Sequence, residues 1–245
     1  DFQLSRIAAG EYDEYIRSWA RGSKAFKRRV YLRFAHEMNY GRYPWAVGVN
    51  GNTGADYIAA WNRVYDIFVE EKAWNVSLVW SPGIEYEGTT PYEDAYPGAE
   101  RVDMVGLSGY NGGSVLPWGG WQSFDKLFGA SYAHLGVLAP GKKVVIAEVG
   151  SVEEGGSKAD WIRHALMVDV TWKYPLIDAV IWFNESREAD WRLETSEEAI
   201  RAVRESRLAR GLMRSSRGLM RSSPLRLSAF GMTSGRGLVE DSTTE

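Results

Sequence analysis

The sequence has no cysteine and only three histidines among 245 residues. Without cysteine the chain has no disulfide, no thiolate metal site and no cysteine nucleophile, and three histidines are too few for a polyhistidine metal cluster. The longest apolar runs fall far short of the roughly 20 residues that a membrane span needs. Lys and Arg number 29 against 32 Asp and Glu, a formal net charge of −3. This balance gives no reason to expect nucleic acid or a membrane as a partner.

The composition is that of a soluble globular protein, with 44% hydrophobic and 25% charged residues. The aromatic content is high, with 11 Trp and 13 Tyr. These rings predict either core packing or a groove in which flat rings stack on sugar faces. The chain opens with Asp1 and shows no cationic or apolar leader. We therefore expect that a leader was removed or that the sequence begins inside a longer protein.

Short apolar strands alternate with helical stretches along the chain. The predicted strands are residues 30–35, 76–80, 102–107, 144–147 and 177–183. The predicted helices are residues 10–26, 56–73, a stretch ending near 138, 158–170 and 196–204. Near-continuous apolar strands are typical of a parallel sheet that is buried on both faces. Polar and aromatic residues gather where each strand ends, and α/β barrels build their active sites at that end.

Two carboxylates stand out because each closes an apolar strand. Glu37 ends the first predicted strand, where strict alternation would put it on one face with Arg33 and Ala35; likewise Glu148 would share a face with Ile146. A charged Arg33 in an apolar strand needs a buried partner. A carboxylate pair across a barrel mouth is what glycoside hydrolysis requires, with retention at about 5–5.5 Å separation and inversion at about 6.5–9.5 Å. The alternative is that each glutamate is a cap or an ion-pair partner.

An ordered set of short motifs adds to this pattern. The motifs are RFAHEMN (33–39), YPW (43–45), VWSP (79–82), YPG (96–98), VDMVGLSGYN (102–111), IAEVGS (146–151), WFN (182–184) and DWR (190–192). From about residue 7 to about residue 204, this set resembles glycoside hydrolase family 26, the β-mannanase family of the clan A barrels. The resemblance implies an α/β fold of the (β/α)8 TIM-barrel type, a polysaccharide substrate and no cofactor or metal.

The resemblance also implies roles for individual residues. Glu37, in HEMN, matches the general acid/base, and Glu148, in AEVG, matches the nucleophile of a retaining enzyme. Five more residues are implied as substrate-binding or supporting groups: His36 beside the acid/base, Arg33 supporting both carboxylates, Tyr110 orienting the nucleophile, Trp45 in the aromatic motif and Trp182 as a sugar platform. We interpret His134 and His164 as structural, since neither lies in a motif.

The implied function is a retaining endo-β-glycanase that cuts internal β-1,4-mannosidic bonds of mannan-type hemicellulose. Such an enzyme is expected to be extracellular and monomeric. Two alternatives stay open, a mixed-linkage β-1,3-1,4-glucanase with the same mechanism and an inactive glycan-binding remnant. Arg42 stands where the family commonly has Trp, and Tyr40 where Gly is common, so a stacking platform is lost or replaced. The loop residues Trp45, Trp118 and Trp121 are expected either to line an open groove or to pack on the barrel.

The boundaries indicate a partial barrel followed by a different tail. If HEMN ends strand four, residues 1–206 supply strands four to eight, so we expect an N-terminally truncated catalytic domain. Residues 207–245 are rich in Arg, Ser and Gly, and the heptad at residues 210–216 repeats at 217–223. We predict that this tail is disordered. The alternative is a basic helical stripe that contacts an anionic surface.

Overall fold

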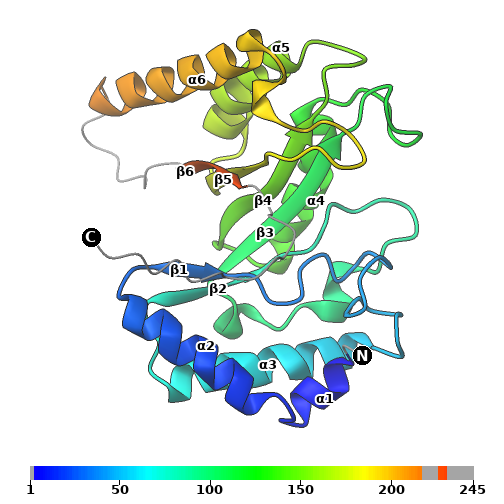
Figure 1. Ribbon diagram of the computed structural model, residues 1–245, viewed down its shortest axis with the longest axis vertical. Coiled ribbons are helices and arrows are strands. Elements are labelled where there is room, and N and C mark those ends of the chain that lie inside the picture. Colours follow the sequence, from blue (N-terminus) through cyan, green and yellow to red (C-terminus); the bar gives the residue numbers. More distant parts are fainter. Residues whose placement is uncertain (1–2, 217–225, 231–245) are drawn as a thin grey trace, which may run out of the picture.

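The computed structural model describes residues 3–216 and 226–230, which form one parallel sheet flanked by helices (Figure 1). Neighbouring strands pair in chain order, β1-β2-β3-β4-β5-β6, and every pair is parallel. The strands are β1 Val30–Leu32, β2 Val76–Trp80, β3 Met104–Asn111, β4 Lys143–Ser151, β5 Ile177–Phe183 and β6 Arg226–Phe230.

Helical segments connect the strands. They are α1 Leu4–Ala8, α2 Asp13–Phe26, α3 Gly54–Glu70, the 3₁₀ turns η1 Tyr92–Ala95 and η2 Ala99–Arg101, α4 Phe124–Leu138, α5 Lys158–Arg163, which continues as the π-helix η3 His164–Lys173, the 3₁₀ turn η4 Leu193–Thr195, and α6 Glu197–Ser216. Within the described residues, no helix combines the length and apolarity that crossing a membrane would need. Strands that pair in parallel and in chain order, joined by helices, form part of a β/α barrel.

The five strands expected from the sequence are all present and all parallel, which confirms the α/β class. The arrangement agrees with a partial TIM barrel. The described strands do not test the expectation that they are strands four to eight of the complete barrel, which stays a prediction.

Helix α3 illustrates how the sequence builds the connections. Thr53 caps it, because its hydroxyl accepts from the Asp56 amide at 3.1 Å while the Asp56 carboxylate accepts from the Thr53 amide at 2.9 Å. Tyr57, Trp61 and Val64 then recur at helical spacing and are buried. This face packs the helix against the sheet.

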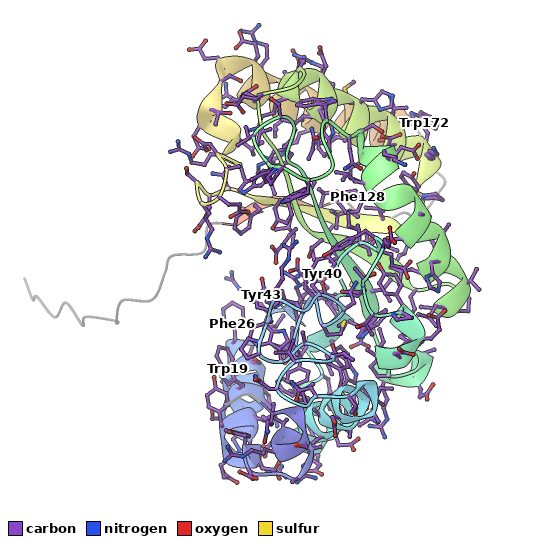
Figure 2. All side chains as sticks on the ribbon, turned by 90° about the vertical axis from the view of Figure 1, so that its right-hand side faces the viewer. Trp19, Phe26, Tyr40, Tyr43, Phe128 and Trp172 are labelled. Carbon is purple, nitrogen blue, oxygen red and sulfur yellow. The ribbon has the colours of Figure 1, made fainter. Side chains whose placement is uncertain are left out.

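The two faces of the sheet carry different cores. On one face, alternate strand residues join the helices in the main core, for example Leu78, Leu107, Ile146 and Val180 with Phe128 of α4. Figure 2 shows Phe128 on α4 in this layer. The opposite face carries a separate cluster made only of strand residues, Val79, Met104, Val145, Ala147 and Ala179. We call this second face the inner face, because it corresponds to the interior of a β/α barrel.

Several predicted element boundaries were wrong, of which three bear on the site or the start of the chain. Strand β1 ends at Leu32, not Ala35, because Ala35 adopts a left-handed conformation with φ 44° that a strand cannot contain. Strand β4 continues to Ser151, four residues past the predicted end. Helix α2 begins at Asp13, and the short helix α1 before it was not predicted.

Part of the predicted disordered tail belongs to regular elements. Helix α6 continues to Ser216, beyond the predicted end near Arg204, and strand β6 pairs with β5 at residues 226–230. For these segments the structure differs from the prediction of disorder over residues 207–245. The rest of the tail, including the second copy of the heptad, lies outside the described residues.

Candidate active site

A β-bulge sets the direction of Glu148. Leu107 of β3 pairs with Ile146 of β4, but the next residue, Ser108, pairs with Glu148, so β4 advances by two residues where β3 advances by one. The extra residue turns Glu148 to the inner face together with Ser108, while Ile146 lies in the helix-side core. The expectation that Glu148 shares a face with Ile146 was therefore wrong, because it assumed an unbroken alternation.

Both oxygens of the Glu148 carboxylate accept hydrogen bonds. Arg33 Nη1 donates to Oε1 at 2.7 Å and the Tyr110 hydroxyl donates to Oε2 at 2.5 Å. Burial and the negative charge of Glu148 raise the pKa of Tyr110, so its phenol keeps its proton and remains a donor. The two donors fix the carboxylate in one orientation. The structure thus brings together three predicted site residues, Arg33, Tyr110 and Glu148.

Arg33 is itself held by two serine hydroxyls. Its Nε donates to Ser81 Oγ at 3.1 Å and its Nη2 to Ser108 Oγ at 3.2 Å. Gly106 leaves room for this contact, because a Cβ there would lie 2.6 Å from Ser81 Oγ. With a third bond to Glu148, the guanidinium is bound along both edges. Sequence analysis assigned no role to Ser81 or Ser108, although both stand in motifs at strand ends (VWSP and GLSGYN).

Glu37 lies on irregular backbone. Ala35 and Glu37 have φ angles of 44° and 53°, and the Glu37 amide donates to the Ser81 carbonyl at 2.8 Å. Asn39, which is buried, bonds Gly83 twice, from its side-chain nitrogen to the carbonyl at 3.1 Å and from the Gly83 amide to its oxygen at 2.9 Å. The HEMN motif is therefore a turn anchored to the end of β2. The predicted alternation of Arg33, Ala35 and Glu37 on one strand face was wrong.

Glu37 has an environment unlike that of Glu148. Only 5% of the Glu37 surface is exposed. Burial, followed by the negative charge of Glu148, raises the pKa of Glu37 to about 7, while Arg33 and a hydrogen bond from Ser108 oppose the shift. At neutral pH a large share of molecules therefore carries a proton on Glu37. A buried carboxyl that retains its proton can act as a general acid.

Aromatic side chains surround His36, next to Glu37. Burial, followed by the charge of Arg33, lowers the pKa of His36 to about 4, so the imidazole is neutral at pH 7. The Trp45 indole donates to the His36 carbonyl at 2.8 Å, and its ring stacks on Tyr43 with 4.7 Å between centroids and 5° between planes. Figure 2 labels Tyr43 on the loop that joins β1 to α3. The structure places two predicted residues, His36 and Trp45, beside Glu37.

Trp182 is the one predicted site residue that the structure does not bring to this cluster. It lies on the helix-facing side of β5, where it is 3% exposed and meets Trp161 of α5 edge to face at 6.1 Å. Its indole donates to the Trp191 carbonyl at 2.7 Å. A sugar platform needs an open ring face, which Trp182 does not present in this structure, so its expected role stays a prediction without structural support. The alternation of β5 gives the inner face to Ala179 instead.

Trp191 is a supporting residue that sequence analysis quoted in the DWR motif without assigning a role. It is fully buried, and its ring lies 5.0 Å from that of Tyr110. A Cβ at Gly150 would lie 2.9 Å from the same indole, so the glycine allows this close approach. Trp191 thus packs behind the tyrosine that bonds Glu148.

The two histidines interpreted as structural bond acidic side chains outside the site, and Arg42 acts on Glu37 only through its charge. His134 bonds Glu85 at 2.8 Å and Glu93 at 2.7 Å, and His164 bonds Asp169 at 3.2 Å. Within the described residues, no cluster of three or more His, Asp or Glu side chains is arranged to hold a metal. Arg42 is exposed, with its guanidinium 5.1 Å above the Tyr40 ring.

The arrangement combines two nearby carboxyl groups with opposite environments. Glu148 is bound by a cationic and a phenolic donor, whereas Glu37 is buried with a raised pKa. Such a division between two carboxyls defines the class of site found in glycoside hydrolases. The comparisons with known proteins give the family.

The model of glycosyl hydrolase family 26 matches residues 12–188, and the chain belongs to this family. Endoglucanase H of Acetivibrio thermocellus is 40% identical over 210 residues, which are 84% of this chain and 23% of that protein. Mannan endo-1,4-beta-mannosidase A and B of Caldalkalibacillus mannanilyticus is 40% identical over 88 residues, 34% of this chain and 16% of that protein. The GH26 beta-mannanase of Bacteroides ovatus superimposes with a TM-score of 0.56 at 18% identity, covering 84% of this chain and 61% of that one. The chain therefore spans only part of each of these relatives.

Proposed function

We propose that the protein is a retaining endo-β-glycanase in which Glu148 is the nucleophile and Glu37 the general acid/base. The observation that carries this proposal is the contrast between the two carboxyls: donors hold the charged group in place, while burial keeps a proton on the other. A double displacement needs one carboxyl group in each state.

In the first step, a Glu148 oxygen attacks the anomeric carbon as the bond to the leaving sugar breaks. The proton of Glu37 passes to the departing glycosidic oxygen, which leaves as a hydroxyl. The product is a covalent glycosyl ester on Glu148. Glu148 loses charge in this step, so the pKa of Glu37 falls because one cause of its elevation has gone.

In the second step, the ionised Glu37 takes a proton from a water molecule that attacks the same carbon. The ester bond breaks, the sugar leaves with its original configuration, and Glu148 regains its charge with Arg33 and Tyr110 as donors. The returning negative charge raises the pKa of Glu37 again, which readies it for the next cycle.

The first proposed substrate is β-1,4-linked mannan, with cleavage within the chain. The match to a mannan endo-1,4-beta-mannosidase supports this choice. A specific observation also favours β-glucan as the second candidate, since the match to Endoglucanase H covers 84% of this chain. The match covers only 23% of Endoglucanase H, so the name of that protein does not decide between mannan and glucan. We further propose a monomer that acts outside the cell.

An inactive glycan-binding remnant is less well supported. Arg33 follows β1, Ser81 follows β2, and Ser108 and Tyr110 lie on β3, yet all four converge on the carboxylates. A protein that only bound glycan would not need a buried carboxyl with a pKa of about 7.

The test is release of reducing ends from mannan, mixed-linkage β-glucan and xylan, with a Glu148→Ala variant of equal thermal stability beside the wild type. Activity on mannan that is lost in the variant supports the full proposal. Activity on β-glucan alone keeps the mechanism and overturns the substrate. Glycan binding without hydrolysis by the folded wild type would contradict the proposed enzyme.

A further inference from the structure

The proposed mechanism makes no use of one fully buried cation. Lys158, the first residue of α5, has no exposed surface. Its ammonium donates to the Arg192 carbonyl at 2.6 Å and to Thr195 Oγ1 at 3.0 Å, and the Trp191 carbonyl lies at 3.5 Å. The ring of Trp182 lies 5.8 Å from the same nitrogen.

This position is unfavourable for a lysine on stability grounds alone. All three hydrogen-bond partners of the ammonium are neutral oxygens. Burial lowers the pKa of Lys158, and Glu153 and Asp190 oppose the shift from further away. Burying a charge without a direct counter-charge costs free energy that hydrogen bonds to neutral oxygens offset only in part, so a residue retained at this cost is expected to have a further role. The bonds of Lys158 all converge on residues 191–195, where the loop after β5 enters the turn η4.

That loop, between β5 and η4, carries Trp191. The Trp191 amide donates to the Glu185 carbonyl at 3.0 Å, and the Trp182 indole donates to the Trp191 carbonyl at 2.7 Å. The turn η4 that follows the loop is tied as well, since Thr195 and the next residue, Ser196, both donate to Glu153. Lys158 joins these two anchored regions, because its ammonium binds the carbonyls of Trp191 and Arg192 in the loop and the hydroxyl of Thr195 in η4.

The side chain of Trp191 transmits this anchoring to the site. Its indole is buried, lies 5.0 Å from the Tyr110 ring and fills the space left by Gly150. The Tyr110 hydroxyl in turn bonds Glu148 at 2.5 Å. Contacts therefore run without a break from the ammonium of Lys158 through Trp191 and Tyr110 to the carboxylate.

We propose that Lys158 is a positioning residue, which fixes the loop carbonyls so that the Trp191 ring holds Tyr110 in hydrogen-bonding position on Glu148. This inference rests on the proposed function, in which Glu148 is the nucleophile. A displacement of the reacting group by about 1 Å can cost on the order of 100-fold in rate, so a loss of the ammonium is expected to act on kcat.

The test is a double-mutant cycle with Lys158→Met and Tyr110→Phe. Lys158→Met keeps the stem and removes the donor. We expect it to lower kcat about tenfold and to change KM by less than about twofold. In the Tyr110→Phe background the same change should lower kcat by less than about twofold, because the bond through which Lys158 acts is already gone. Lys173→Met, which removes an exposed ammonium bonded to Asp125, is the matched control and should leave kcat unchanged.

Equal loss of kcat in both backgrounds would overturn the inference, because a general loss of packing adds independently of Tyr110. If Lys158→Met does not fold, Lys158→Gln, which keeps a shorter donor, replaces it in the same cycle. Crystal structures of the wild type and the variant supply a readout that needs no activity. A Tyr110–Glu148 distance that stays at 2.5 Å in the variant would contradict the inference even if the wild type hydrolyses nothing, so the two failures are distinguishable.

Discussion

Glu148 and Glu37 occupy opposite kinds of backbone, and this difference matches the work proposed for each. Glu148 stands inside the long strand β4, and donors on β3 and at the end of β1 reach both of its oxygens. Glu37 stands in a turn of left-handed residues and is buried against the end of β2. A regular strand supplies the fixed geometry that a nucleophile needs, whereas a tight, buried turn supplies the desolvation that raises the pKa of an acid.

The comparison shows how one site produces two protonation states. Arg33 acts on both carboxyls, but it bonds Glu148 directly and acts on Glu37 only through its charge. Ser108 contacts both sides, since it accepts from Arg33 and hydrogen-bonds Glu37. Arg33 and Ser108, which act on both carboxyls, thus contribute to the difference in environment between Glu37 and Glu148.

The largest expected effect distinguishes the role of Glu148 from that of Glu37, by comparing substrates whose leaving groups differ in pKa. Glu148→Ala should lower kcat by about 10⁴-fold or more on polysaccharide and on an activated aryl glycoside alike, since both need the nucleophile. Glu37→Ala should lower kcat about 10²- to 10⁴-fold on polysaccharide. On the aryl glycoside it should leave the first step nearly unchanged, because a phenolate of low pKa leaves without protonation, and slow only the second step, which needs Glu37 as base. Stopped-flow release of dinitrophenolate measures this first step. Equal losses of the first step in both variants would contradict the division of roles.

Removal of the shared cation should give the next largest effect. Arg33→Met leaves Ser81 and one Glu148 oxygen without their donor, so we expect kcat to fall about 100-fold. The basic limb of the kcat/KM profile should also move upward, because Arg33 opposes the rise in the pKa of Glu37. A profile that keeps its shape would show that Arg33 acts on Glu148 alone. Arg163→Met is a suitable control, since this arginine bonds Glu205 and Asp160 and is not among the charges that act on Glu37.

The pH dependence of stability tests the burial of Glu37. Its pKa rises from 4.5 in the unfolded chain to about 7, so the folded state binds the proton more tightly. Stability is then full below pH 4.5 and falls by about 3 kcal/mol as pH rises through 7. The Glu37→Gln side chain cannot titrate. Relative to the wild type, the free energy of unfolding of this variant, measured with urea, should therefore be higher at pH 8 than at pH 5. Parallel wild-type and variant curves would mean that Glu37 is solvated.

The smallest expected effect concerns Trp182. Trp182→Phe should leave KM within about twofold of the wild type, because the ring faces the helices. It should lower stability by about 1 kcal/mol through loss of the bond to the Trp191 carbonyl. Thermal unfolding and hydrolysis assays on the same sample check both parts. A rise in KM of tenfold or more would restore Trp182 as a sugar platform.

Several features could be predicted from the sequence because they depend on local patterns. Apolar periodicity located five parallel strands, and the motifs identified both carboxylates as well as Arg33 and Tyr110, which the structure brings together. These residues follow or end apolar runs, where the position along the strand suffices to place them near the site.

Other features could not be predicted because they depend on departures from regular alternation. The bulge in β4 reverses the face of Glu148, and the left-handed Ala35 ends β1 early; neither carries a sequence signal such as Gly at that position. The burial of Trp182 follows from the same uncertainty about faces. Lys158 could not be found at all, because its partners are mostly backbone carbonyls more than 30 residues away.

The most direct test of the central claim is covalent trapping with a 2-deoxy-2-fluoro glycoside of the sugar that the enzyme accepts, followed by peptide mass spectrometry. The account predicts a single added fluoroglycosyl group on the peptide that contains Glu148, and none in Glu148→Gln. A label on Glu37, or steady turnover with no covalent species at any time, would contradict the assignment of the two carboxyls.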